Sequence, residues 1–121
     1  MRIGVDATCW WSKRGFGRFT RELLKAMISE PRGHEFVFFV DQQPVSEMLV
    51  PYVDVIEVKQ TRPVTKAAVA SSSRSVKDLL AFRHAVSQQS LDLFFFPAVY
   101  SWYPIPRNLP MVLTLSQTHF P

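Results

Sequence analysis

Two glycines stand one residue apart in a cationic segment near the start of the chain, "SKRGFGRFTR", where Gly15 and Gly17 lead into a helical pattern. The basic side chains around them are Lys13, Arg14, Arg18 and Arg21. A helix entrance offers unsatisfied N–H groups and the positive end of the helix dipole, and glycine lets a phosphate approach the backbone. Arginine can hold a phosphate through two parallel hydrogen bonds. The segment fits phosphate binding, and it equally fits a glycine-containing turn followed by a solvated basic face.

The same letters approximate the G-x-G-x-x-G fingerprint of dinucleotide-binding proteins, with Asp41 in the place of the ribose-binding carboxylate. Two departures argue against a nicotinamide cofactor. Thr20 occupies the third glycine position, and residues 8–14 separate the first predicted strand from Gly15, where the fingerprint requires a tight turn.

Other reactive side chains show no spacing typical of a metal site or of a Ser-His-Asp triad. The three histidines are scattered, and Cys9 is the single cysteine. We therefore expect no metal and no internal disulfide, and we expect Cys9 to be a buried structural thiol. Asp6 is expected to end a strand and to accept hydrogen bonds from the local backbone, and its position leaves acid/base chemistry open.

Aromatic side chains gather in two predicted loops, where they could stack on a sugar, a nucleobase or a lipid surface. Core packing, or contact with another domain, is the alternative. They are Trp10, Trp11, Tyr100, Trp102 and Tyr103. Nothing typical of a nucleic-acid-binding motif accompanies them, so we expect no nucleic acid partner.

The composition predicts one globular domain, since 121 residues of which 47% are hydrophobic suffice for one core. The formal net charge of +4 favours anionic partners, including nucleotides and an acidic membrane surface. Neither a secretory signal nor an apolar run of about 20 residues is visible. We therefore expect a cytoplasmic protein, with peripheral contact at the inner membrane surface left open.

Continuous apolar runs predict five strands, at residues 2–7, 34–41, 53–59, 91–97 and 111–115. Helical spacing predicts a helix over residues 16–28, a short helical piece at 46–49 and a second long helix that begins at Ser75. The inner stripe of that second long helix is expected to contain Val76, Leu79, Leu80, Arg83 and Val86. Residues 60–74 are expected to form a surface loop.

This order of elements predicts an α/β fold, a Rossmann-like three-layer domain with a mostly parallel five-stranded sheet. Ligands of such sheets bind at the carboxyl ends of the strands. The loops expected at this edge are residues 8–17, 41–44, 98–108 and 116–121. The fifth strand has no helix after it to cover the sheet, which predicts an uncovered edge capable of self-association, or a longer parent protein.

Four segments resemble the amino-terminal domain of GT-B glycosyltransferases, specifically the group-1, or family-four, retaining enzymes. In chain order they are "RIGVDA", "RGFGRFTRELL", "LDLFFFPAVY" and "PMVLTL". The resemblance implies that residues 1–121 form a single acceptor-side domain, and that a C-terminal donor-binding domain is absent from this chain. The parent would transfer a hexose from a nucleotide sugar to a carbohydrate or lipid-linked acceptor without a metal or other cofactor, and this domain alone would be inactive.

The resemblance also assigns roles to particular residues. The backbone N–H groups of Gly15, Phe16 and Gly17, helped by Arg18, would stabilise charge on the departing diphosphate. A bulky β-branched residue at Gly17 is therefore expected to weaken donor binding more than folding. Residues expected at the acceptor site or the cleft edge are Trp11, Arg14, Tyr100, Trp102, Ser116 and Gln117.

The chain departs from the family at the end of the fifth predicted strand. Similar enzymes commonly continue with a His-Asp pair near the donor sugar, whereas this chain has Ser116 and Gln117. His119 is the candidate catalytic residue in place of that histidine, provided that the loop is rearranged. The alternative function is a non-catalytic nucleotide- or anion-binding α/β module, or a self-assembling one.

Overall fold

Five parallel strands form one sheet in the order β3-β2-β1-β4-β5. The computed structural model describes residues 1–60, 76–98 and 101–114. The strands are β1 (Arg2–Asp6), β2 (Glu35–Val40), β3 (Val53–Glu57), β4 (Leu93–Phe96) and β5 (Met111–Leu113). The predicted α/β class and the five strands are confirmed, and every strand pair is parallel.

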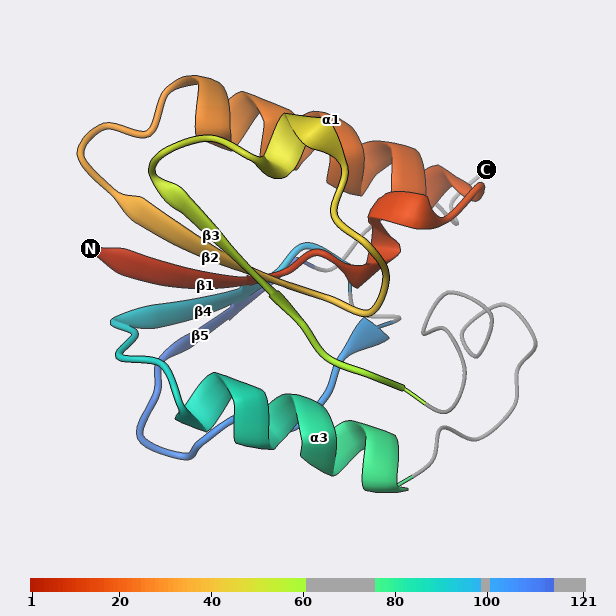
Figure 1. Cartoon of the computed structure of the whole chain (residues 1–121), viewed down its shortest axis with the longest axis vertical. Coiled ribbons are helices and arrows are strands. Elements are labelled where there is room, and N and C mark those ends of the chain that lie inside the picture. Colours follow the sequence, from red (N-terminus) through yellow and green to blue (C-terminus); the bar gives the residue numbers. More distant parts are fainter. Residues whose placement is uncertain (61–75, 99–100, 115–121) are drawn as a thin grey trace.

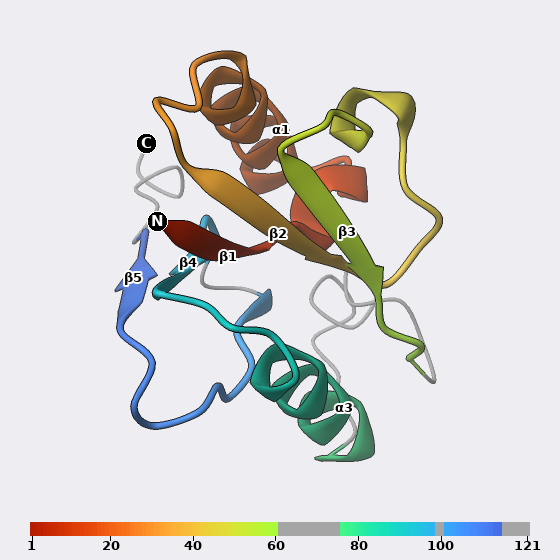
Figure 2. The same cartoon turned by 60° about the vertical axis from the view of Figure 1, so that its left-hand side comes forward.

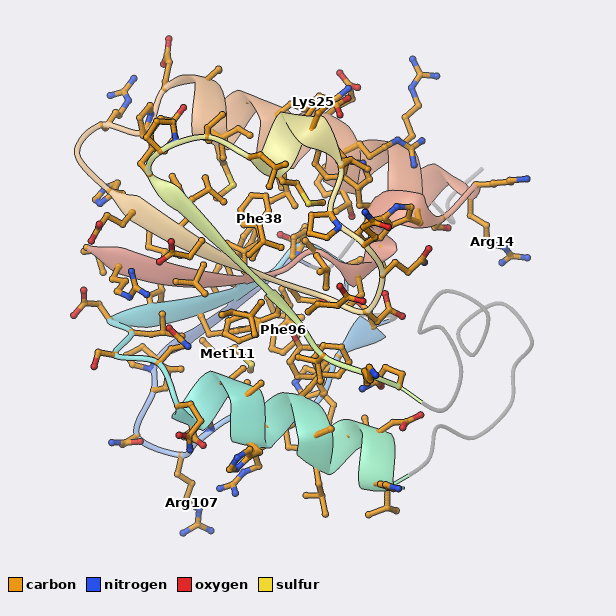
Figure 3. The ribbon with its side chains drawn as sticks, viewed as in Figure 1. Arg14, Lys25, Phe38, Phe96, Arg107 and Met111 are labelled. Atoms are coloured by element: carbon orange, nitrogen blue, oxygen red, sulfur yellow. The ribbon has the colours of Figure 1, made fainter. Side chains whose placement is uncertain are left out.

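Two long helices cover opposite faces of the sheet, which makes the domain three-layered (Figures 1 and 2). The first face carries α1 (Gly15–Ser29), together with the short 3-10 helices η1 (Thr8–Trp11) and η2 (Ser46–Met48). The second face carries α3 (Val76–Ser87). Each face has its own apolar cluster, with Phe38 buried beneath α1 and Phe96 buried on the α3 side (Figure 3).

The first helix forms where the sequence predicts it, because its buried positions recur every four residues. Thr20, Leu24 and Ile28 are all buried against the sheet. The helix ends before a turn in which Arg32 and Gly33 have φ angles of 52° and 81°, in the left-handed region. Glycine adopts this conformation without strain, so Gly33 lets the chain reverse into β2.

The predicted inner stripe of α3 is wrong for three residues. Val76, Leu80 and Arg83 are exposed, whereas Leu79 and Val86 lie on the inner side as expected. The centre of the inner side is Phe82, which is fully buried and stacks on Tyr103 with ring centroids 4.2 Å apart. The helix turns this way because an aromatic ring removes more apolar area from water than Leu80 would.

In the described part of the chain, the sheet ends at β5. Met111 is 45% exposed and Val112 is 46% exposed, and β4 is the only described strand that pairs with β5. Edge strands with exposed apolar side chains are ready to pair with a further strand. Whether this edge pairs with a further strand stays a prediction.

Candidate functional site

The strand order reverses beside β1, and this reversal locates the ligand-binding crevice expected for an open parallel sheet. The chain runs from β1 outward to β2 and β3, and then crosses to β4 on the other side of β1. Ligands bind outside the carboxyl ends of the strands at such a switch point. The connections after β1 and β4 flank it, so the glycine-bearing entrance to α1 lies beside the expected binding edge.

A buried carboxylate joins the two connections at the switch point. Asp6 Oδ1 accepts hydrogen bonds from the Thr8 N–H at 3.1 Å and from the Thr8 hydroxyl at 2.7 Å. Asp6 Oδ2 accepts a further hydrogen bond from the Ser101 hydroxyl. All three residues are buried. The local role expected for Asp6 is confirmed, and its bond to Ser101, 95 residues away in the sequence, fixes the second connection as well.

Arg21 holds the η1 segment from the first turns of α1. Its Nη1 donates to the Trp10 carbonyl at 2.6 Å and to the Ser12 carbonyl at 2.8 Å. Trp10 itself is buried in the core beneath α1, and Lys25 Nζ lies 5.9 Å from the centre of its ring. Arg21 therefore fixes the backbone before the helix entrance, a role that the sequence pattern did not indicate.

Gly17 is required by the packing of the chain on itself. A Cβ atom at this position would meet the Ser12 carbonyl oxygen and would lie 2.7 Å from the Ser12 carbonyl carbon. The N–H groups of Gly17 and Arg18 both donate to the Arg14 carbonyl, at 2.9 Å and 3.3 Å. The phosphate role expected for these backbone groups therefore depends most on Gly15 and Phe16, and it stays a prediction.

The surface around Gly15 is open and cationic. A Cβ atom at Gly15 would meet no atom within 4 Å in the described part of the chain. Lys13, Arg14 and Arg18 are exposed beside it, and Figure 3 shows the Arg14 side chain extending into solvent. The helix entrance thus combines space, positive charge and the amino end of a 15-residue helix.

The predicted aromatic group separates into core and surface residues. Trp10 and Tyr103 are buried in the two apolar clusters, which confirms core packing for both. Trp11 is half-buried against the cluster beneath α1. Trp102 is 43% exposed, with its ring centre 6.5 Å from that of Phe96, and it retains a surface on which a ring could stack. Four other predicted site residues lie outside the described residues: Tyr100, Ser116, Gln117 and His119.

Cys9 is buried next to Asp6, and this environment determines how readily its thiol loses a proton. Burial, together with the smaller effect of the nearby Asp6 charge, raises the pKa of the thiol from 9.0 to about 12. The thiolate is the nucleophilic form, so this cysteine is unreactive near neutral pH. The expectation of a buried structural thiol is confirmed. Among the described residues, no group of three or more His, Cys, Asp or Glu side chains could hold a metal ion.

We expect the folded chain to resist alkylation of Cys9 by iodoacetamide at pH 8, and the same chain in urea to react fully. Because the thiol pKa is higher in the folded state, its contribution to stability is complete below the unfolded pKa of about 9 and is lost as the pH rises towards 12. Mass spectrometry would follow the alkylation. Rapid labelling of the folded chain at pH 8 would contradict the buried position.

An open groove of about 430 Å³ lies at the opposite edge of the sheet, where β4 and β5 begin. Its lining includes Ser90, Asp92 and Asn108. Asp92 already accepts a hydrogen bond from the Arg2 N–H at 2.7 Å. The groove is therefore separate from the switch point and from the glycine-bearing helix entrance.

The sheet order and the covering helices define a Rossmann-like α/β domain. No protein-family model matches the chain, and no curated protein matches its sequence. In the described residues no helix has both the length and the apolar character needed to cross a membrane.

Proposed function

We propose that this chain is the acceptor-side domain of a two-domain retaining glycosyltransferase that transfers a hexose from a nucleotide sugar to a carbohydrate or lipid-linked acceptor. The observation that carries the proposal is the open cationic entrance to α1 at the switch point of the sheet. This is the place where a parallel α/β sheet binds phosphate-bearing ligands. The resemblance of four sequence segments to group-1 enzymes supplies the reaction class.

The chemistry assigned to this entrance is stabilisation of the leaving diphosphate. The N–H groups of Gly15 and Phe16 and the exposed guanidinium of Arg18 would supply positive charge where negative charge develops. Arg21 and the Asp6 hydrogen bonds hold the preceding segment in place, so the donors would be positioned before the donor sugar binds. No metal is required for this stabilisation.

The acceptor would approach the same edge from the β4 side. Trp102 offers an exposed ring, and the half-buried Trp11 lies on the η1 segment across the switch point. Flat aromatic rings suit the apolar faces of sugars. A second, donor-binding domain would close the site from outside, in a protein that we place in the cytoplasm.

Calorimetric titration of the two-domain parent with UDP- and GDP-sugars tests the proposal. We expect Arg18→Gln to weaken donor affinity by about tenfold, because it removes a charge-assisted hydrogen bond. Arg32→Gln is the matched control, since Arg32 is also exposed, lies just beyond the other end of α1 and carries the same charge. Donor affinity should be unchanged in this control.

Absence of donor binding and of transfer across a broad donor panel would refute the transferase. Equal losses of affinity in the two variants would show a general charge effect and would remove the role of Arg18. Both variants change exposed side chains, so a folded protein is expected in each case.

The exposed β5 edge favours a second candidate, a non-catalytic nucleotide- or anion-binding module that assembles through strand pairing. Met111 and Val112 are the side chains that this pairing would cover. Light scattering distinguishes the two candidates, because a strict monomer at high concentration excludes assembly through β5. In the parent gene, a second β-α-β series carrying an E-x7-E-like segment would favour the transferase.

A further inference from the structure

The groove of about 430 Å³ lies between the end of α3, the turn into β4 and the turn before β5 (Figure 1). Its volume falls within the range of about 300–1,000 Å³ that is typical of small-molecule sites. The proposed donor site lies at the other end of the strands, so the transferase proposal does not account for this groove. Its polar lining residues are Ser87, Gln89, Ser90, Asp92 and Asn108.

Arg2 fixes the positions of two of these side chains. Its backbone N–H donates to Asp92 Oδ2 at 2.7 Å, and its Nη2 donates to Gln89 Oε1 at 3.1 Å. The Asp92 N–H in turn donates to the Arg2 carbonyl at 2.8 Å. Within residues 1–60, 76–98 and 101–114, the remaining polar atoms, Asp92 Oδ1 and Gln89 Nε2, form no hydrogen bond with protein. The groove therefore offers one acceptor and one donor on side chains that are already held in place.

A closed turn contributes Asn108 from the β5 side of the groove. The Leu109 N–H donates to the Pro106 carbonyl at 3.1 Å, which is the hydrogen bond of a β-turn with Arg107 and Asn108 at its corners. Asn108 is exposed, and its amide supplies both a donor and an acceptor. Pro106 and Pro110 add apolar surface next to it.

This combination of groups favours a neutral ligand with several hydroxyl groups. The Asp92 carboxylate repels an anion, while the Arg2 guanidinium, which also pairs with Asp54 at 3.2 Å, repels a cation. A hydroxyl group can donate to a carboxylate and can accept from an amide N–H. Apolar surface beside a few fixed polar groups suits a ring that carries hydroxyl groups at its rim.

We propose that this groove binds a neutral saccharide, as a second site separate from the proposed donor site. Asp92 Oδ1 accepts a hydrogen bond from one hydroxyl group, while the amides of Gln89 and Asn108 donate to other hydroxyl oxygens. The inference goes beyond the proposed transferase and does not depend on it, because the groove lies at the opposite end of the strands. A saccharide bound here anchors a glycan to the domain without occupying the switch point.

Nuclear magnetic resonance titration of the ¹⁵N-labelled chain, without any nucleotide sugar, tests the proposal. The probes are glucose, mannose, galactose and maltose, each added to about 50 mM, because an open site with a few hydrogen bonds is expected to have a Kd of about 1 mM. At least one probe should shift the backbone amide signals of Gln89, Asp92 and Leu109 and leave that of Gly15 unchanged. Inorganic phosphate at the same concentration should leave the signals of the groove unchanged.

Asp92→Asn should weaken binding of the strongest probe by about tenfold, because the hydrogen bond from the sugar hydroxyl loses its charged acceptor. The asparagine keeps one oxygen for the Arg2 N–H. Glu35→Gln is the matched control, since Glu35 is exposed at the start of β2 and carries the same charge at the same end of the sheet, outside the groove. Its affinity should stay within about twofold of that of the original chain.

Asn108→Ala gives an independent test if Asp92→Asn disturbs the contacts of Arg2. It should weaken binding by about fivefold through the loss of an amide hydrogen bond. Gln88→Ala is its control, because Gln88 is an exposed amide beside the groove but not in its lining. No shift at the groove with any sugar, the same shifts with phosphate, or equal losses in the variants and their controls would each overturn the proposal.

Discussion

Replacing Phe82 with alanine is expected to lower the free energy of unfolding by about 3–5 kcal/mol. The ring is fully buried, and it stacks on Tyr103 with an interplanar angle of 7°. Alanine would lose the transfer energy of the ring and leave a cavity among Phe94, Phe96 and Tyr103, which belong to the same apolar cluster. A loss of this size is a large part of the 5–15 kcal/mol that stabilises a typical domain.

Leu80→Ala is the matched control on the same helix, and it should change the free energy of unfolding by about 0.5 kcal/mol or less. Leu80 lies two residues before Phe82 and faces solvent. Urea unfolding followed by circular dichroism would measure both variants. Similar losses for the two variants, or a larger loss for Leu80→Ala, would show that α3 is turned the other way.

The contrast between these two residues shows where sequence reasoning about the fold succeeds. The most buried strand is a short continuous apolar run, "FVFFV" in β2, and such a run is recognisable without knowledge of neighbouring elements. The orientation of α3 is different, because apolar residues lie on both sides of the helix. Its inner side is selected by Tyr103 and the β4 aromatics, which pack on Phe82 from distant parts of the sequence.

The candidate site likewise has one part that the sequence predicts and another part that it does not. The position of the helix entrance follows from the strand-then-helix order, and the structure places it beside the switch point as predicted. The Asp6–Ser101 hydrogen bond and the hydrogen bonds from Arg21 to two backbone carbonyls are tertiary contacts. No spacing in the sequence predicts them. One signal was available for Gly17, because a glycine inside a helical pattern often marks a close approach of another backbone segment.

That close approach leads to the second large effect, at Gly17. Gly17→Ala is expected to lower the free energy of unfolding by about 2–3 kcal/mol, because the added Cβ atom overlaps the Ser12 backbone. Helix propensity alone would favour alanine by about 1 kcal/mol, so a loss isolates the packing term. The packing thus reverses the expectation that substitution at Gly17 affects donor binding more than folding. Thermal and urea unfolding would measure the change.

Gly15→Ala is the matched control, and it separates packing from ligand approach. Within the described chain nothing lies within 4 Å of a Cβ atom at this position, so we expect stability to be unchanged or to rise by up to about 1 kcal/mol. In the two-domain parent, Gly15→Val should remain folded and bind nucleotide sugars more weakly, because its side chain would occupy the space of the diphosphate. A folded Gly15→Val protein with undiminished donor affinity would show that the helix entrance is not part of the donor site. If Gly17→Ala is destabilised and Gly15→Ala is not, the packing reason for Gly17 would still hold.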